Sequence, residues 1–164
     1  MRVAGAGRVA ILAGLAVMLA GCSLFGGAGE EGESIKVFDA KPGQCLLPPA
    51  EVEAQISSLT VVPCSQPHTQ EAYAVVPFKA KGTQAGAAGT GAYPGDAVLK
   101  TFAEGVCAQH YADYVGIDYL DSSYFFTYLL PSARGWDQGP DRDVLCIVTT
   151  TGEKLTASVK GAKR

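Results

Sequence analysis

Residues 63–78 read Pro-Cys-Ser-Gln-Pro-His-Thr-Gln-Glu-Ala-Tyr-Ala-Val-Val-Pro-Phe, a proline-bounded loop that runs directly into an apolar stretch. The stretch from Glu71 to Phe78 predicts a strand, because its side chains would alternate between two faces. One face is expected to carry two of these side chains and the other face three: Tyr73 and Val75, opposite Ala74, Val76 and Phe78. The segment therefore predicts a strand that is entered from a turn carrying a cysteine.

The clearest helical pattern follows residues 80–92, which are mostly Gly, Ala and Thr and predict a mobile surface loop. The helix is expected to begin at Pro94-Gly95-Asp96, with Asp96 as its N-cap. Seven side chains then recur at intervals of three and four residues, which places them on one helical face: Leu99, Phe102, Ala103, Val106, Cys107, His110 and Tyr114.

Short apolar runs between turn signals predict further strands at residues 35–38, 59–62, 124–130, 143–148 and 155–159. A short helical turn is expected within 51–58, and a loop over 131–142. Val144, Cys146 and Val148 are expected to face inward together, and Leu155, Ala157 and Val159 alternate with polar residues. The pattern predicts an α+β fold in which an antiparallel sheet packs against one main helix.

The N-terminal residues 1–21 have the layout of a secretory signal peptide, with Arg2 and Arg8 before an uncharged run that ends at Ala20-Gly21-Cys22. That run is about half the length that a membrane-spanning helix needs. Small residues directly before a cysteine resemble a bacterial lipobox, which implies a lipidated Cys22 as the new N-terminus. Residues 22–34 are then a lipidated, flexible tether, and residues 35–164 form one globular domain. We expect a membrane-anchored protein on the outer, extracytoplasmic face of the cell membrane.

The charge of the chain argues against nucleic acid as a partner. Without residues 1–21, the chain has 11 basic and 16 acidic residues, a formal net charge of −5. Basic residues gather only at Lys160, Lys163 and Arg164, so the lipid is expected to provide the anchoring.

Four cysteines follow Cys22: Cys45, Cys64, Cys107 and Cys146. An even number in an exported chain predicts two disulfides. Of three connectivities, Cys45–Cys64 with Cys107–Cys146 is favoured because each pair ties neighbouring segments together. The loop-entropy model assigns about 3 kcal/mol to the shorter ring and about 4 kcal/mol to the longer ring.

His68 and Glu71 are the candidate polar pair of the loop that follows Cys64. A structural role would have the imidazole bonded to backbone or to Glu71, whereas a functional role would make the two a proton-transfer pair. The sequence contains neither Gly-x-Ser-x-Gly nor His-Glu-x-x-His, so no catalytic residue is assigned. A metal site at Cys64, His68 and Glu71 is not expected, because an oxidised cysteine is lost as a ligand; no cofactor is expected either.

Trp136, Asp141 and Arg142 are the other candidates for binding or for structure. The sole tryptophan either covers the sheet or offers an exposed aromatic platform, and its large apolar area favours the covering role. Asp141 and Arg142 could contact a ligand, with a local salt bridge or turn as the default.

Several motifs together resemble a known family: Pro42-Gly43-Gln44-Cys45-Leu46, Val62-Pro63-Cys64-Ser65-Gln66-Pro67-His68 followed by Glu71, Cys107, and Trp136 with Gly139, Asp141-Arg142 and Cys146. The chain resembles the septum-formation-related domain of exported and membrane-anchored proteins in high-GC Gram-positive bacteria. Pro140 departs from the family's Trp-x-x-Gly-Asp-Arg pattern, and the Gly/Ala loop before Pro94 has the look of an insertion.

The resemblance implies a link to septum formation or cell division and brings neither a reaction nor a ligand. We therefore expect a non-catalytic interaction module that contacts envelope or division proteins. Two alternatives stay open: a receptor for a cell-wall fragment or small ligand with Trp136 in its cleft, and a small envelope hydrolase that uses His68 and Glu71.

Overall fold

The computed structural model describes residues 32–49, 55–78, 91–139 and 141–164. The predicted signal peptide, Cys22 and most of the tether lie outside the described residues, as do residues 80–90 of the expected surface loop and residues 51–54, the first half of the helical turn expected within 51–58. The first strand begins at Glu33, two residues before the expected start of the globular domain.

Six strands, two α-helices and one 3-10 helix make up the described part of the chain. In chain order they are β1 (Glu33–Lys36), η1 (Val37–Asp39), β2 (Cys45–Leu47), β3 (Ser58–Val62), β4 (Gln70–Pro77), α1 (Asp96–Val115), β5 (Phe125–Leu129), α2 (Ala133–Gln138) and β6 (Asp143–Thr149).

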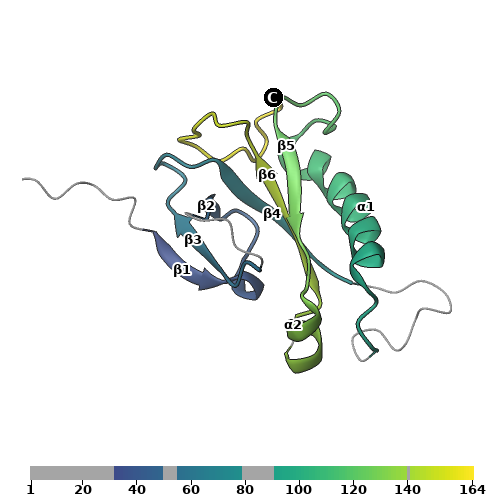
Figure 1. Ribbon diagram of the computed structural model, residues 1–164. Helices are drawn as coiled ribbons and strands as arrows, with labels where there is room; N and C mark the ends of the chain where they lie inside the picture. The colour runs from purple at the N-terminus through teal and green to yellow at the C-terminus, as the bar shows by residue number, and fades with distance from the viewer. Residues whose placement is uncertain (1–31, 50–54, 79–90, 140) are drawn as a thin grey trace, which may run out of the picture.

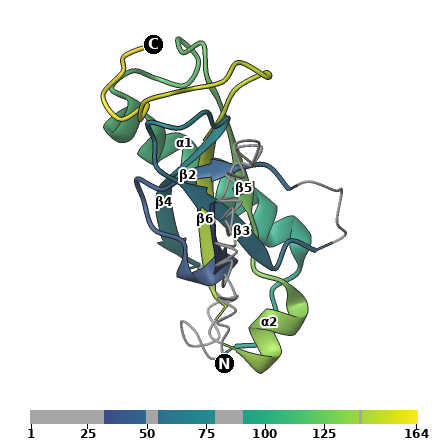
Figure 2. The ribbon, with the colours of Figure 1, turned by 90° about the vertical axis from the view of Figure 1, so that its left-hand side faces the viewer.

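The strands form one antiparallel sheet in the order β1-β3-β2-β4-β6-β5. Helix α1 lies along one face of β4, β6 and β5, while β1, β3 and β2 curl away from it toward the other side (Figure 1). The segment after β6 lies at one end of the molecule and α2 at the opposite end (Figure 2). The predicted α+β fold with one main helix is confirmed.

The face assignment predicted for β4 is wrong at Tyr73, because the strand contains a β-bulge. Ala72 pairs with Ile147 and Ala74 with Cys146, which leaves Tyr73 as the extra residue. The bulge turns Tyr73 to the helix-covered face, where Ala74 also packs, whereas Val75 packs on the other face.

Helix α1 buries residues at four-residue steps: Leu99, Ala103, Cys107, Tyr111 and Val115. Phe102, Val106 and Tyr114 flank them as predicted, but His110 is exposed, and Tyr111 takes the buried position. The predicted N-cap is also wrong by one residue, since Gly95 caps the helix and the Asp96 carboxylate accepts a hydrogen bond from Tyr93 Oη. Gly116 ends the helix with φ +92°, a left-handed conformation that glycine adopts at no steric cost.

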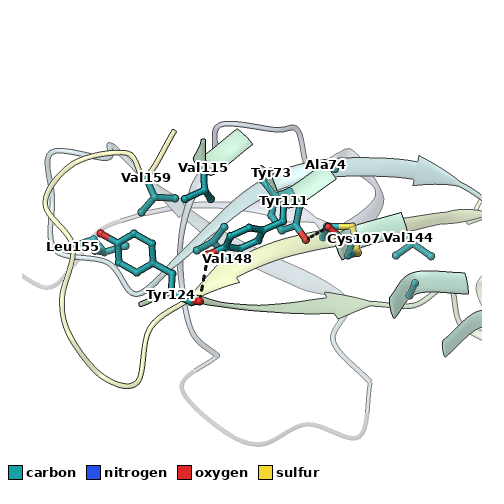
Figure 3. Packing of buried hydrophobic residues seen from close by; sticks show 12 residues of the cluster. Tyr73, Ala74, Cys107, Tyr111, Val115, Tyr124, Val144, Val148, Leu155 and Val159 are labelled. Carbon is teal, nitrogen blue, oxygen red and sulfur yellow. Dashed lines mark hydrogen bonds between the residues drawn. A yellow bond between two sulfur atoms is a disulfide. The ribbon is translucent and has the colours of Figure 1, made fainter. Parts of the chain in front are cut away.

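Both faces of the sheet carry an apolar core. Between the sheet and α1, the aromatic rings of Tyr73 and Tyr111 meet edge to face with centroids 5.8 Å apart, and Tyr73 Oη donates to the Cys107 carbonyl oxygen at 2.8 Å (Figure 3). Val144, Cys146 and Val148 face this core together, as predicted. The other face buries a second cluster: Ala40, Leu46, Leu59, Ala72, Leu145 and Ile147.

The two disulfides join the predicted pairs, Cys45–Cys64 and Cys107–Cys146. Cys107–Cys146 ties α1 to β6 inside the core, and both of its residues are fully buried. Cys45–Cys64 ties β2 to the loop that precedes β4, and Cys64 is half-buried.

The last predicted strand, residues 155–159, does not form. Only Leu155 makes a bridge, to His68, and Ala157 is exposed while Leu155 and Val159 are buried. The amide of Val159 donates to the Glu71 carboxylate instead of to the backbone of a neighbouring strand, so it takes no part in strand pairing. The loop expected over 131–142 contains the short helix α2, whose N-cap Ser132 accepts from the Gly135 amide at 2.9 Å.

Candidate functional site

The fold brings together four residues that we call the disulfide centre: Cys45, Cys64, His68 and Glu71. Cys45 is the first residue of β2 and pairs with Glu71 on β4, while His68 bridges to Leu155 just before β4. Cys45, His68 and Glu71 each have one atom that could ligate a metal ion, and these three atoms lie within 4.8 Å of one another. The short spacing from Cys64 to Glu71 indicated the grouping of Cys64, His68 and Glu71, and Cys45 joins them through the disulfide and through its pairing with Glu71.

Glu71 is fully buried and accepts three hydrogen bonds. Its Oε1 accepts from Tyr114 Oη at 2.5 Å and from Ser158 Oγ at 2.6 Å, and its Oε2 accepts from the Val159 amide at 2.7 Å. Burial, and then the hydrogen bond to Glu71, raise the pKa of the Tyr114 phenol above its ordinary value. The carboxylate thus joins α1 to the segment after β6, two parts of the chain that the sequence pattern did not connect.

His68 is 1% exposed and is held by backbone. Its Nδ1 lies 2.8 Å from the Gln66 carbonyl oxygen, and its own amide and carbonyl bond to Leu155 at 3.0 and 2.7 Å. A carbonyl oxygen only accepts hydrogen bonds, so Nδ1 carries a proton, and in the neutral imidazole Nε2 presents a lone pair. The imidazole therefore bonds to backbone rather than to Glu71, and Nε2 is buried without a hydrogen-bond partner among the described residues.

Trp136 forms a second cluster at the α2 end of the sheet, away from the disulfide centre. Its indole is 4% exposed, its Nε1 donates to the Gly91 carbonyl oxygen at 2.8 Å, and the rings of Phe78 and Tyr93 meet it edge-on. The Arg142 guanidinium lies 4.2 Å from the ring centroid, close enough for a cation–π contact. The indole covers the end of the sheet and offers little free surface.

Asp141 supports the turn into α2. Its Oδ2 accepts from the Ser132 amide at 3.1 Å. Burial raises the pKa of the Asp141 carboxyl, and the hydrogen bond from Ser132 opposes that change. Arg142 donates to the carbonyl oxygens of Gly139 and of Asp141, in addition to its contact with the ring of Trp136.

A shallow hollow of about 20 Å³, enough for about one water molecule, lies between η1 and the ends of β4, β5 and β6. Val37, Phe38, Val75 and Leu129 provide much of its apolar wall, and three consecutive charged residues line it as well: Asp141, Arg142 and Asp143. Arg142 links this hollow to Trp136, because its guanidinium also covers the indole ring.

Strand β5 is an edge of the sheet and carries exposed apolar side chains. It pairs with β6 on one side, and among the described residues no strand pairs with its other side. Phe125 on the strand is 53% exposed, and Leu120 in the loop before it is 77% exposed. We call the open edge of β5 with Phe125 and Leu120 the β5 surface, which could not be identified from the sequence. The partly exposed Tyr119 packs against Phe126 on the helix-covered face instead.

Among the described residues, none of the helices combines the length and apolar composition that spanning a bilayer requires.

The fold and these clusters define a small α+β domain in which two disulfides and a buried carboxylate fix the chain. The family described as septum formation matches residues 42–163, most of the sequence, and the chain belongs to this family. Comparison with curated proteins and with solved structures gives no significant match. The resemblance predicted from the cysteine and His68 motifs is confirmed.

Proposed function

We propose that this protein is a non-catalytic, extracytoplasmic lipoprotein that acts as an interaction module and contacts its protein partner through the β5 surface. Membership of the septum-formation family suggests a septum-related role. The proposal adds how the domain serves that role: it holds another envelope or division protein at the membrane.

The observation that carries the proposal is the unpaired, uncharged edge of β5. Its sequence, Phe-Phe-Thr-Tyr-Leu, contains no charged residue and no proline, the features by which edge strands commonly avoid pairing. The opposite edge, β1, contains Glu33 and Lys36. An open edge flanked by exposed Phe125 and Leu120 suits a partner that adds an extended strand and buries apolar side chains.

Burial of the polar pair supports a non-catalytic role. A general base must reach its substrate within hydrogen-bond distance. His68 and Glu71 are closed off from solvent, and Glu71 is occupied by three donors that hold the fold. The candidate hydrolase pair is thus better suited to stability than to proton transfer with an external molecule.

The proposed anchor is Cys22. Its acylation would hold the domain on the outer face of the membrane, with residues 23–32 as the connection to β1. The excess of acidic residues supports a lipid rather than an electrostatic attachment.

In-cell crosslinking followed by mass spectrometry tests the proposal. We expect division or wall-synthesis proteins to crosslink to the wild-type chain and to be lost from both Cys22→Ala and Phe125→Glu. Ser34→Glu, an exposed substitution on the β1 edge, is the matched control and should retain them. Equal recovery with Phe125→Glu would refute the β5 surface, and normal division after loss of the protein would refute the septal role.

A small-ligand receptor is the second candidate, because the Arg142 guanidinium lies over the ring of Trp136. A ligand that bound at Arg142 and displaced the guanidinium from Trp136 would change the fluorescence of the only tryptophan in the chain. Titration with muropeptides checks this: a saturable change supports a receptor, and constant emission across the titration argues against it.

A further inference from the structure

Among the described residues, Nε2 of His68 has no hydrogen-bond partner, so the fold leaves this atom of the disulfide centre without a role. A buried polar atom without a partner carries a desolvation cost that folded proteins usually avoid. The other ring nitrogen, Nδ1, bonds to the Gln66 carbonyl oxygen. In the neutral imidazole, Nδ1–H bonds to a backbone carbonyl and Nε2 keeps a buried lone pair, and metal-ligating histidines commonly adopt this arrangement.

Two further donor atoms lie beside this imidazole. Cys45 Sγ and a Glu71 carboxylate oxygen are both within 4.8 Å of a His68 ring nitrogen and of each other. A carboxylate has about four lone-pair positions. Glu71 accepts three hydrogen bonds, and only the one from the Val159 amide is to Oε2. Oε2 therefore keeps a position for a cation without loss of the bonds that hold the fold.

The fourth donor is Cys64, which the disulfide places next to Cys45. A tetrahedral zinc ion with bonds of about 2.0 to 2.3 Å has donors about 3.3 to 3.8 Å apart. The separations among the ligand atoms of Cys45, His68 and Glu71 exceed this by no more than about 1.5 Å. Thiolate, imidazole and carboxylate ligands in such a set are those that zinc prefers.

We propose that reduction of Cys45–Cys64 converts the disulfide centre into a zinc site with Cys45, Cys64, His68 and Glu71 as its four ligands. A dithiol supplies two electrons and two protons: the Cys45–Cys64 bond breaks, two protein thiols form, and the dithiol becomes a disulfide. Zinc then displaces the two thiol protons to solvent and binds both thiolates. In the oxidised chain the two sulfur atoms are bonded to each other, so that form is not expected to bind zinc.

Exposure selects which disulfide a reductant reaches first. Attack requires access to a sulfur atom, and Cys64 is half-buried whereas Cys107 and Cys146 are both fully buried. The change is therefore expected at Cys45–Cys64, while Cys107–Cys146 continues to tie α1 to the sheet.

Zinc binding by the full chain is the test. The chain carries Cys22→Ala, which removes the one cysteine outside the two disulfides. A phosphine reductant is used because it brings no competing thiolate, and alkylation with mass spectrometry counts the thiols released. We expect one zinc per reduced chain and none per oxidised chain, and X-ray absorption of the bound zinc should show two sulfur and two nitrogen or oxygen ligands.

Two histidine variants give the matched comparison, because the chain has only His68 and the exposed His110. His68→Phe fills similar space without a nitrogen, and should weaken zinc binding by at least about 100-fold, since loss of an outer-shell group alone costs about 10- to 100-fold. His110→Ala should bind as the parent does. Equal affinity in the His68→Phe and His110→Ala chains would overturn the proposal.

A thermal melt decides the case in which reduction loosens the fold. Zinc added before the reductant should raise the melting temperature of the reduced parent and of His110→Ala, and should leave His68→Phe unchanged. If zinc stabilises none of the reduced chains, or if X-ray absorption shows no nitrogen or oxygen ligands on the parent's zinc, the proposed site does not exist.

Discussion

Replacing Glu71 with glutamine keeps the size of the side chain but removes its charge and one of its acceptor oxygens. In one orientation the new amide NH₂ faces the Val159 amide, and that donor loses its acceptor. In the other it faces the hydroxyls of Tyr114 and Ser158, which then lose the acceptor of their own protons and must accept instead. Hydrogen bonds to charged groups contribute about 1.5–3 kcal/mol each. With one bond lost and the others weakened, we expect Glu71→Gln to lower the free energy of unfolding by about 2–4 kcal/mol.

Urea denaturation followed by Trp136 fluorescence measures this change, with both disulfides intact. Hydrogen exchange adds a local readout, because the Val159 amide should exchange faster when its acceptor is a neutral amide oxygen instead of a carboxylate. Glu104→Gln is the control: this carboxylate is exposed on α1, 4.0 Å from the Lys100 ammonium, and should change stability by less than about 0.5 kcal/mol. Equal stability of the Glu71→Gln chain and the parent would refute the role given to the buried carboxylate.

Three further predictions concern stability. Replacing both Cys107 and Cys146 with alanine should lower the free energy of unfolding by about 4 kcal/mol, because the bridge closes a long loop. Urea denaturation measures this, and a decrease below about 1 kcal/mol would contradict the prediction. Burial raises the pKa of Tyr73 above its ordinary value of 10.0, so its neutral form stabilises the fold below pH 10 and stability should fall as the pH rises above 10. Tyr73→Phe should make this fall shallower, and an unchanged slope would argue against it. Trp136→Ala should lower the free energy of unfolding by about 3–5 kcal/mol, because it leaves a cavity at a buried site, and Trp136→Phe should lower it less. Unfolding followed by circular dichroism measures both changes.

The helix and most strands could be predicted because their patterns are local. The buried residues of α1 from Leu99 to Cys107 recur about every four residues, and the buried residues of β6 that face α1 recur every two. Both periods can be read directly from the sequence. The disulfide pairs followed from proximity along the chain. His68 and Glu71 were grouped for the same reason, since three residues separate them.

The errors arise where a contact from a distant part of the chain overrides the local pattern. The bulge at Tyr73 reverses the face that simple alternation assigns, and it places the phenol against Cys107 on α1. Residues 155–159 alternate like a strand, but the carboxylate of Glu71 binds the Val159 amide. Neither Tyr114 nor Ser158 could be connected to Glu71 from sequence, because periodicity does not say which buried groups meet.

The β5 surface could not be found from sequence either. Phe125 belongs to an apolar run, and such runs usually indicate burial. Its exposure follows from the position of β5 as the last strand of the sheet, which depends on the order of all six strands.

Site-specific photocrosslinking in growing cells tests the central claim, that the β5 surface holds a protein partner. A photoreactive amino acid is placed at Phe125 on one edge of the sheet, and at Ser34 on the other edge as the control. We predict a crosslink from position 125 to a division or wall-synthesis protein, and none to that protein from position 34. The same crosslinked products from both positions, or none from position 125, would contradict the claim.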